Sequence, residues 1–561
     1  MPKKWRLRKP DPADQALLVN ELHIHPVVAK LLVNRKVLDP QQARTFLEPG
    51  LAQLLDPFLL KDMDRAVARL KLACERGEKV LVYGDYDVDG ITATAVTYRL
   101  LRRLGVPAIT YIPHRMEEGY GLNADIITLA KAEYISLIIT VDCGITAFDA
   151  AEALGREGID LIILDHHEPE GGRIPRAVAV VDPKRPDCAY PCPQLAGVGL
   201  AAKFVQAVTG SFPVEDLDII TLGTVADVVA LTGENRIFVH AGLPFLTLTT
   251  KPGLRALIDV ARLTGKEMTP FSVGFGLGPR LNAAGRMGSA NVSLDLLLSD
   301  DPGNAMALAQ SLETLNRERQ RLQAEVVDEA MALIAEDAAY AEETVIVVCK
   351  EGWHKGVLGI AASKITDKFG RPAVVISIQD GRGVGSARSV PGFFLNEAFA
   401  HCAALLESFG GHQRAAGLKL REDRIADFRR TVNLFARDIA AARDLVPVLD
   451  IDAEMPFPQV SLEIVKTVES LAPYGEGNPL PIFATRRLLV KSRPQLMGKD
   501  TIKFWATDGR VSFSVVGFGM GADCAELRMG QAVDIAYTLG IDDWNKAPQV
   551  QLMLKDIRPA K

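Results

Sequence analysis

Two hydrophobic patterns alternate along residues 46–300. Short apolar runs occupy residues 80–83, 137–141 (interrupted only by Thr140) and 161–164, and longer stretches between them have apolar residues at helical spacing. The helix expected from Ile91, for example, has an apolar face at Ala95, Leu100 and Leu104. Such runs are typical of strands buried on both faces, and their alternation with helices predicts a parallel α/β sheet.

A long helix is predicted after this region, from the N-cap and first-turn signal of Asp301 and Pro302 to about residue 337. Arg319 and Glu329 interrupt an apolar stripe at coiled-coil-like spacing, made of Leu308, Leu312, Leu315, Leu322, Val326 and Leu333. Coiled-coil pairing is one interpretation. We favour a helix that connects two lobes of one monomer and sets the width of a cleft between them.

The remaining pattern predicts two further domains. Residues 341–443 again alternate strand and helix, as expected for a second, smaller α/β domain. Residues 444–561 contain short alternating strands that fit a β-barrel of the OB type, although a sandwich stays open. The full predicted division is an N-terminal extension (1–45), a catalytic domain (46–300), a connecting helix (301–340), and these two domains.

Composition narrows the class of protein. The 561 residues are 48% hydrophobic, which is typical of an ordered globular protein. The seven cysteines show no disulfide or zinc spacing, and neither a signal core nor a membrane-length apolar run is present. We therefore expect a cytoplasmic protein with no membrane span. A net charge of −6 argues against a generally basic nucleic-acid coat, but it leaves room for a local basic channel.

Acidic and histidine residues follow three of the predicted strands. Asp85, Asp87 and Asp89 come after the first, Asp142 after another, and the triplet 165–167 (Asp-His-His) after a third. Because ligands of open α/β sheets gather at the carboxyl ends of strands, these groups should meet at one edge. Crowded carboxylates repel one another, and hard divalent cations such as Mg²⁺ or Mn²⁺ relieve that repulsion.

Two more observations bear on this edge. Asp227 lies within a predicted apolar helix, where its charge needs a partner, and a nearby cation would supply one. The alternative for the first acidic stretch alone is a turn that caps a helix, with Asp89 or Gly90 near the N-cap.

The motifs YGDYDVDG (83–90), VDCG (141–144), LDHH (164–167) and TVADVV (224–229) resemble, in order and spacing, the DHH phosphoesterase superfamily. More narrowly, they are similar to its RecJ branch of 5′→3′ exonucleases specific for single-stranded DNA. The resemblance spans essentially the whole chain. Related inorganic pyrophosphatases have a histidine where this chain has Asp85, which favours the nuclease branch.

The resemblance implies a ligand set for two ions. One would be held by Asp85, Asp87 and Asp142, and the other by Asp89, Asp142, His166 and Asp227, with Asp142 as the bridge. The ions would activate a water and clamp the attacking and leaving oxygens. His167 would lie against the scissile phosphate and, with Arg280 and His412, stabilise charge on the phosphoryl oxygens.

Substrate contacts are expected from glycine-rich stretches. Residues 276–290 (GLGPRLNAAGRMGSA) predict a flexible loop that offers Arg280, Asn282 and Arg286 to phosphate oxygens. In the second α/β domain the stretches EGWHKG, VGSARS and FGGHQRAAG resemble the DHH-associated domain. Arg388 and His412 would face the metals across the cleft. The further candidates in this set are Arg115, Trp353, Ser386 and Gly411, of which Arg115 and Ser386, with Arg388, are the candidates for a 5′ phosphate.

The predicted barrel offers charge and stacking for single strands through Arg486, Arg487, Lys491, Arg493, Lys503 and Trp505. The function predicted from all of this is release of 5′-mononucleotides from single-stranded DNA by a monomer, in DNA repair and recombination. The resemblance further implies single-strand-binding protein and a helicase as partners, and association with the nucleoid. Two alternatives stay open: a phosphodiesterase of short oligonucleotides or cyclic dinucleotides, and an inactive single-strand-binding scaffold.

Overall fold

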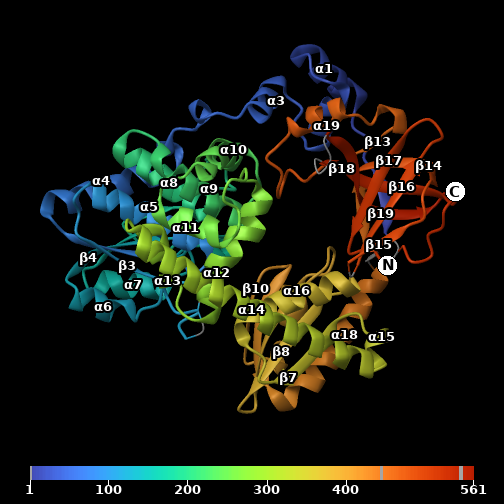
Figure 1. Ribbon diagram of the computed structural model, residues 1–561. Coiled ribbons are helices and arrows are strands. Elements are labelled where there is room, and N and C mark those ends of the chain that lie inside the picture. Colours follow the sequence, from blue (N-terminus) through green and yellow to red (C-terminus); the bar gives the residue numbers. More distant parts are fainter. Residues whose placement is uncertain are drawn as a thin grey trace. The chain divides into compact units, whose positions relative to one another are not determined.

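The computed structural model describes residues 3–115, 117–119, 121–442, 447–498, 500–522, 524–542 and 547–560 (Figure 1). The chain forms two units. The first contains residues 56–227 and 243–447, and the second contains residues 3–55, 228–242 and 448–561. The predicted boundary at residues 443 and 444 lies outside the described residues.

A parallel sheet is the centre of the first unit. Its strands are β2 (Lys79–Gly84), β3 (Ala108–Tyr111), β4 (Ile135–Val141), β5 (Asp160–Leu164) and β6 (Ala179–Val181). They lie in the order β3-β2-β4-β5-β6, and all are parallel. From β2 the chain goes to β3 on one side, and then to β4 on the other. The crevice between the carboxyl ends of β2 and β4 is therefore the topological switch point of the sheet.

Helices pack against this sheet, and Figure 1 shows α6 (Ile126–Ala132) and α7 (Phe148–Arg156) beside it. These two helices share a buried core with Leu81 and Tyr83 of β2. On the other face, α5 (Val88–Arg103), α8 (Gly197–Thr209) and α9 (Leu217–Ala226) pack on one another. The same unit contains α4 (Met63–Arg76), α11 (Pro252–Val260) and α13 (Asn291–Leu298), and α10 (Gly233–Thr247) ends in it. The predicted parallel α/β fold is confirmed.

A second sheet follows in the same unit. Its strands are β7 (Ile346–Glu351), β8 (Ala373–Gln379), β9 (Arg382–Arg388), β10 (Ser408–Gly411) and β11 (Ala415–Arg421), in the order β10-β11-β9-β8-β7. Its helices are α16 (Leu358–Phe369), α17 (Leu395–His401) and α18 (Ile425–Ala442). Two of the glycine-rich stretches noted in the sequence are thus strand segments: VGSARS runs along β9, and FGGHQRAAG is the β10–β11 hairpin.

The long connecting helix is confirmed as α14 (Pro302–Glu336), with the Asp301 side chain accepting a hydrogen bond from the Asn304 amide at 2.6 Å. The short helix α15 (Ala339–Glu342) follows. The predicted apolar stripe is wrong in part. Leu312 and Val326 are buried, but the leucines at 308, 315, 322 and 333 are only half-buried. The buried stripe is Ala305, Ala309, Leu312, Asn316, Arg319, Gln323, Val326, Ala330 and Ile334. Arg319, which was expected to interrupt the stripe, is part of it.

Residues 276–290 are not the flexible loop that their glycines indicated. Residues Ser272–Leu277 form a π-helical segment that continues directly into α12 (Gly278–Met287). Pro279 suits the first turn, where no amide donor is needed. Leu281, Ala283 and Ala284 are fully buried, so tertiary packing outweighs the low helix propensity of the glycines.

The second unit contains the predicted OB-type barrel. Its strands are β14 (Phe483–Val490), β16 (Thr501–Thr507), β17 (Ser512–Phe518), β18 (Ala532–Asp542) and β19 (Gln549–Pro559). The pairings run β14-β18-β19-β17-β16 and return from β16 to β14, through Leu489 with Thr507 and Val490 with Ala506. The short strands β13 (Ala453–Glu454) and β15 (Gln495–Met497) extend it, and α19 (Leu462–Glu469) packs against it.

The N-terminal residues are part of this second unit rather than a separate arm. Strand β1 (Lys4–Leu7) pairs in parallel with β12 (Val448–Ile451), and Arg6 forms an ion pair with Asp450 at 2.5 Å. Helices α1 (Pro12–Leu22), α2 (Pro26–Asn34) and α3 (Pro40–Leu47) share one core with the barrel. The sequence did not indicate this pairing. The first residues are basic, and a single edge strand whose partner lies far along the chain leaves little local signal.

The packing of α9 on its neighbours gives a stability test. A Cβ at Gly223 would lie 2.1 Å from Thr92 Oγ1 and 2.8 Å from Val198 Cγ1. Both neighbours are buried and β-branched, so they cannot turn away. We expect Gly223→Ala to lower the melting temperature, with a cost of about 1–3 kcal/mol. Gly155→Ala is the control, because Gly155 lies in α7 and a Cβ added there would meet no atom within 4 Å. Equal melting temperatures for the two variants would contradict this packing.

Candidate metal centre

Four segments bring acidic and histidine side chains to the switch point of the first sheet. Asp85, Asp87 and Asp89 lie where β2 passes into α5, and Asp142 directly follows β4. The histidine pair follows β5. Asp227 is the C-cap residue of α9 rather than an interior residue of an apolar helix, as the sequence suggested. The geometric core of the sequence prediction is confirmed: these groups meet at one edge.

The side chains form three groups whose candidate ligand atoms lie within 4.8 Å of one another. Each group combines residues from at least two separate segments. The groups are Asp85 with Asp87 and Asp142, Asp89 with His166 and Asp227, and Asp142 with His166 and His167. Asp142 belongs to the first and third groups, and the third shares His166 with the second, so Asp142 lies between the first and second groups.

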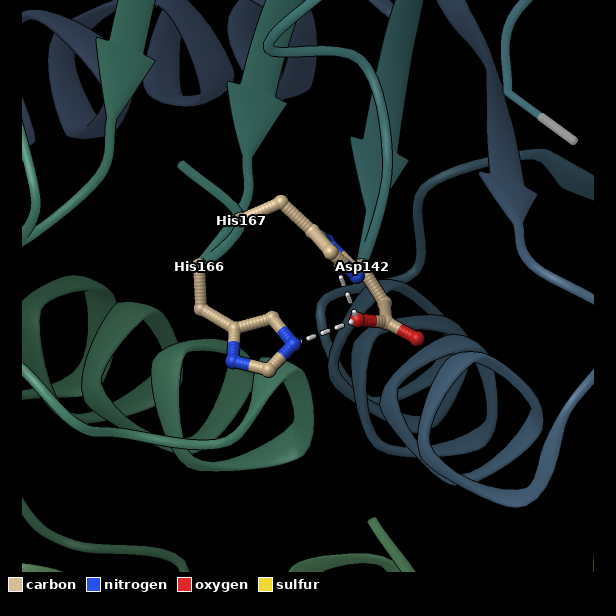
Figure 2. Close-up of side chains that lie close together, drawn as sticks. All are labelled: Asp142, His166 and His167. Carbon is tan, nitrogen blue, oxygen red and sulfur yellow. Dashed lines mark ion pairs between the residues drawn. The ribbon is translucent and has the colours of Figure 1, made fainter. Parts of the chain in front are cut away.

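Asp142 is at the centre of the site. His166 Nε2 lies 3.1 Å from its Oδ1, and His167 Nδ1 lies 3.9 Å from the same atom; Figure 2 shows both rings turned towards this carboxylate. The Asp142 backbone has a φ of 60°, a left-handed conformation that aspartate tolerates better than most residues. A Cβ at Gly197 would lie 2.7 Å from Asp142 Cβ, so the start of α8 approaches the carboxylate closely only because residue 197 is glycine.

Backbone amides hold the other carboxylates in place. Asp89 accepts hydrogen bonds from the amides of Gly197 and Val198 at 2.6 and 2.8 Å. Asp87 is the N-cap of α5, and its Oδ1 accepts from the amides of Asp89 and Gly90 at 2.9 and 3.1 Å. The cap was expected at Asp89 or Gly90, so the helix begins slightly earlier than predicted, at Val88. Capping and metal ligation are therefore compatible here, since a carboxylate has two oxygens.

Burial without compensating cations raises the pKa values of these carboxyl groups. Burial, reinforced by the neighbouring Asp87, raises the pKa of Asp85 to about 8 and that of Asp227 to about 7. Burial and the charge of Asp227 raise the pKa of Asp89 well above its usual value, and burial and Asp89 do the same for Asp142. In addition, Asp85 Oδ1 is buried without a hydrogen-bond partner among the described residues. Clustered oxygen donors with this need for positive charge fit Mn²⁺ or Mg²⁺.

The two adjacent histidines have opposite character. Burial, together with the neighbouring His167, lowers the pKa of His166 to about 3, so its ring is neutral and can serve as a ligand. Burial opposes protonation of His167 too, but the hydrogen bond to Asp165 (Nδ1 to Oδ1, 2.8 Å) dominates and raises its pKa to about 9. His167 is therefore a cationic donor, which suits a phosphate contact better than a metal.

Asp165 organises this turn, and no role for its side chain was predicted from the sequence. It accepts hydrogen bonds from the amides of Ile145, His166 and His167, in addition to the ring of His167. Although burial raises its pKa, the contact with His167 outweighs that effect and lowers the value to about 2. Its position at the end of an apolar strand could have indicated this role, since a buried acid needs hydrogen-bond donors nearby, and the following two residues supply them.

The predicted substrate residues divide into two sets. Arg115, Arg286 and Arg388 repel one another electrostatically: burial and then Arg115 lower the pKa of both Arg286, to about 9, and Arg388. Arg388 donates to Ser386 Oγ at 3.3 Å, and Arg286 donates to the Gly356 carbonyl at 3.2 Å. Asn282 lines a pocket together with Arg286. These residues form a positively charged region between the two sheets of the first unit.

The other predicted substrate residues lie elsewhere or have partners. Arg280 forms an ion pair with Glu313 at 2.8 Å and also donates to the Gly276 carbonyl. Trp353 is only 6% exposed and donates its indole N–H to Glu329 at 2.6 Å, so it is a core residue and does not present a stacking surface. Gly411 and His412 lie, exposed, in the hairpin that joins β10 to β11.

Comparisons with known proteins agree with this geometry. Residues 79–230 match the DHH family, N-terminal domain; residues 342–438 match the DHHA1 domain; and residues 451–556 match the RecJ OB domain. The single-stranded-DNA-specific exonuclease RecJ of Bacillus subtilis is 38% identical over 556 residues, which cover 99% of this chain and 70% of the relative. The protein of the same name from Escherichia coli is 31% identical and is covered in full, as is this chain.

A solved structure is similar as well. RecJ in complex with Mn²⁺ from Thermus thermophilus superposes with a TM-score of 0.85 at 30% identity, covering 100% of this chain and 80% of that one. A structure of the same protein with Mg²⁺ has a TM-score of 0.80 at 28% identity, covering 100% and 79%. The resemblance that the motifs indicated, and the predicted domain types, are confirmed.

The raised carboxyl pKa values predict how metal affinity depends on pH. In the unfolded chain these acids lose their protons near pH 4, whereas in the metal-free folded chain Asp227 and Asp85 keep them to about pH 7 and 8. The metal-free fold therefore loses stability as pH rises through this window, and a bound cation restores it. We expect Mn²⁺ affinity to rise between pH 6 and 8, roughly tenfold per pH unit for each proton displaced.

Titration calorimetry in two buffers of different ionisation enthalpy would count the protons released. The gain in melting temperature from Mn²⁺ should likewise be larger at pH 8 than at pH 6. Asp160→Asn is the matched control, because Asp160 lies at the opposite end of β5 and pairs with Arg69. A Mn²⁺ affinity that stays constant over this range would contradict the protonated, metal-free site.

Proposed function

The chain belongs to the RecJ family, and we propose that it is a metal-dependent exonuclease that removes 5′-mononucleotides from single-stranded DNA. The observation that carries this proposal is that Asp142, which belongs to the group of Asp85 and Asp87, also lies 3.1 Å from His166 of the group of Asp89 and Asp227, so that one carboxylate can be shared between the two groups. Such sharing is typical of sites that hold two divalent ions for phosphodiester hydrolysis.

Two ions fit the ligand set that the sequence implied. Asp85, Asp87 and Asp142, which form one group, would hold one ion. Asp89, His166 and Asp227, which form another, would hold the second, and Asp142 would join them as the bridge, since its Oδ1 lies 3.1 Å from His166 Nε2. When bound, divalent ions lower the pKa of water and stabilise the charge of attacking and leaving oxygens. The protein's part is to fix the carboxylates beforehand, through the amide hydrogen bonds to Asp87 and Asp89.

Other side chains of the site act on the phosphate. Protonated His167, held by Asp165, would donate to a phosphoryl oxygen, and it keeps its proton up to a pH of about 9. Arg115, Ser386 and Arg388 would hold the terminal 5′ phosphate, with Arg286 and Asn282 on the adjoining phosphate. For His412 and Gly411 we propose a contact across the cleft from the exposed β10–β11 hairpin. Arg280 would have to leave Glu313 to reach the phosphoryl oxygens.

Selectivity for single strands would follow from confinement and from the barrel. Because Arg286 donates to Gly356, the start of the second α/β domain lies close to the metal-bearing lobe, and a duplex is wider than one strand. The barrel presents the exposed Trp505 among basic residues. Arg486 already pairs with Glu454, so the remaining basic residues would do more of the binding. Stacking and backbone charge bind single strands without reading sequence.

The alternatives find less support. A phosphodiesterase of very short or cyclic substrates has no need of the RecJ OB domain at residues 451–556. A scaffold without activity has no need of a complete ligand set. Roles in repair and recombination, partnership with single-strand-binding protein and a helicase, a monomeric state and nucleoid association stay predictions. No helix in the described part of the chain is both long and apolar enough to cross a bilayer.

Digestion of end-labelled DNA tests the proposed activity. With Mn²⁺ or Mg²⁺, a long 5′-phosphorylated single strand should yield 5′-mononucleotides from its 5′ end, and a blunt duplex should stay intact. Chelation should stop the reaction. Faster turnover of dinucleotides than of long strands would favour the phosphodiesterase, and Mn²⁺ binding without any cleavage would favour the scaffold.

Asp142→Asn tests the shared ligand. It keeps the size of the side chain but removes one negative charge from both ligand groups, so we expect nuclease turnover to fall by at least 10³-fold, as when a charge-stabilising group is lost. The melting temperature without metal should stay equal or rise, because a repelling carboxylate is removed. Asp160→Asn, at the other end of the neighbouring strand, should keep turnover. Wild-type turnover in Asp142→Asn with saturating Mn²⁺ would refute the assignment.

A further inference from the structure

Two phenylalanines stand out on the surface of the first unit. Phe271 and Phe275 are 71% and 73% exposed, and their rings stack on each other at 4.7 Å between centroids and 28° between planes. Phe271 is the N-cap of the π-helical segment Ser272–Leu277 and Phe275 lies within it, and π-helical turns often occur at functional sites. Large apolar rings left in water are unfavourable, and such patches usually mark a binding surface.

A small polar pocket adjoins the same segment. It has a volume of about 150 Å³, the share of about five water molecules in the liquid. Gly274 and Gly278, next to and just beyond Phe275, form one wall. Other walls come from α12, α14 and α16, through Asn282, Arg286, Arg319 and Ile360. Ala226, which directly precedes the metal-centre residue Asp227, also lines it.

The pocket has positive charge that no ion pair among the described residues neutralises. Arg319 is 8% exposed, and its guanidinium donates only to neutral oxygens, Asn316 Oδ1 at 2.8 Å and Gln323 Oε1 at 3.0 Å. Arg286 donates to a carbonyl. Among the residues that the structure describes, neither guanidinium has a carboxylate at ion-pair distance, and burial followed by the charges of Arg115 and Arg319 lowers the pKa of Arg286 to about 9. Buried cations in this state favour a bound anion.

We propose that Phe271 and Phe275, together with the adjoining Arg319 pocket, form a nucleotide subsite that stacks unpaired bases and holds one backbone phosphate of single-stranded DNA. The subsite deepens the proposed function and rests on it. One segment carries both parts, because Gly274 lines the pocket and Phe275 offers its ring. It adjoins the terminal-phosphate residues Arg115 and Arg388, whose charges act on Arg286, and it lies beside the metal ligand Asp227 through Ala226.

The occupant is a nucleic acid rather than an acidic peptide. Two flat, exposed rings suit bases, which stack on aromatic side chains whatever their sequence. The pocket between α12, α14 and α16 also brings two guanidinium groups together, and a phosphate offers enough oxygens to accept from both. Asn316 and Gln323 hold Arg319 by neutral contacts, so the guanidinium keeps its full charge for the ligand.

Binding of a nuclease-resistant phosphorothioate oligothymidylate to the full chain with Mn²⁺ tests this subsite. Phe271→Ala and Phe275→Ala should each weaken binding roughly 5- to 150-fold, raising KM while leaving kcat unchanged. Phe275→Leu keeps an apolar side chain but loses the flat ring, so it should bind as weakly as Phe275→Ala, and Phe275→Tyr should restore affinity. Tyr134→Ala is the matched control, because Tyr134 is 88% exposed and precedes β4, at the opposite edge of the sheet.

The dependence on salt separates the two parts of the subsite. Arg319→Gln should reduce the slope of log affinity against log salt by about 0.7, the value for one phosphate on a single strand, and Arg319→Lys should keep the slope. The phenylalanine variants should leave the slope unchanged, because they remove no charge. Fluorescence of 2-aminopurine in the oligonucleotide should be quenched by the wild type and not by Phe275→Leu.

Other results would overturn the proposal. Wild-type affinity in both alanine variants would do so, as would retained affinity in Phe275→Leu, which would indicate apolar docking such as that of a peptide. If the wild type cleaves single strands and the variants match it in KM, the subsite fails and the exonuclease stands. If the wild type binds strands through these residues but cleaves none, the exonuclease fails and the subsite stands.

Discussion

The mutual repulsion of buried carboxylates is the constraint on which the first unit depends. Asp85, Asp89, Asp142 and Asp227 approach one another at the carboxyl ends of β2 and β4, and the burial of the first three keeps water from screening them. Without a cation such a cluster takes up protons, which is why its pKa values are raised. With a cation the same cluster is an attractive site. The fold therefore provides a place whose metal-free state is unfavourable, and that disadvantage favours a bound cation over the protonated cluster.

Backbone groups around the cluster stabilise this unfavourable arrangement of carboxylates. Amides at the starts of α5 and α8 fix Asp87 and Asp89, and Asp142 adopts a left-handed backbone where the tight approach of Gly197 leaves its carboxylate one position. Local surroundings also explain the difference between the two histidines. Two adjacent, identical side chains acquire pKa values of about 3 and about 9, because one ring is buried near the cluster and the other touches Asp165. Environment, not residue type, assigns their roles.

The sequence predicted what depends on local pattern and chain direction. Short apolar runs located β2, β4 and β5, and parallel pairing then placed the residues after them at one edge, so the ligand groups followed. It did not predict what depends on tertiary packing. The glycines around Arg280 suggested a loop, but burial of Leu281 and Ala284 makes it a helix. The joining of β1 to β12 involves residues more than 400 positions apart, and the amides that hold Asp89 come from α8, so neither leaves a motif.

The error in the predicted stripe of the connecting helix α14 has a physical explanation. Its buried positions keep a regular heptad spacing from Ala305 to Ala330, yet the middle of the stripe is polar, with Asn316, Arg319 and Gln323. The apolar end from Val326 to Ile334 packs in the core of the second α/β domain, while the first half packs on α11 and α12. A leucine stripe identified by hydrophobicity alone misses the middle, because a helix that joins two cores can be buried between them without being apolar there. Arg319 of this polar centre lines the pocket together with Arg286, so the helix that connects the two α/β domains also places charge beside α12 and α16.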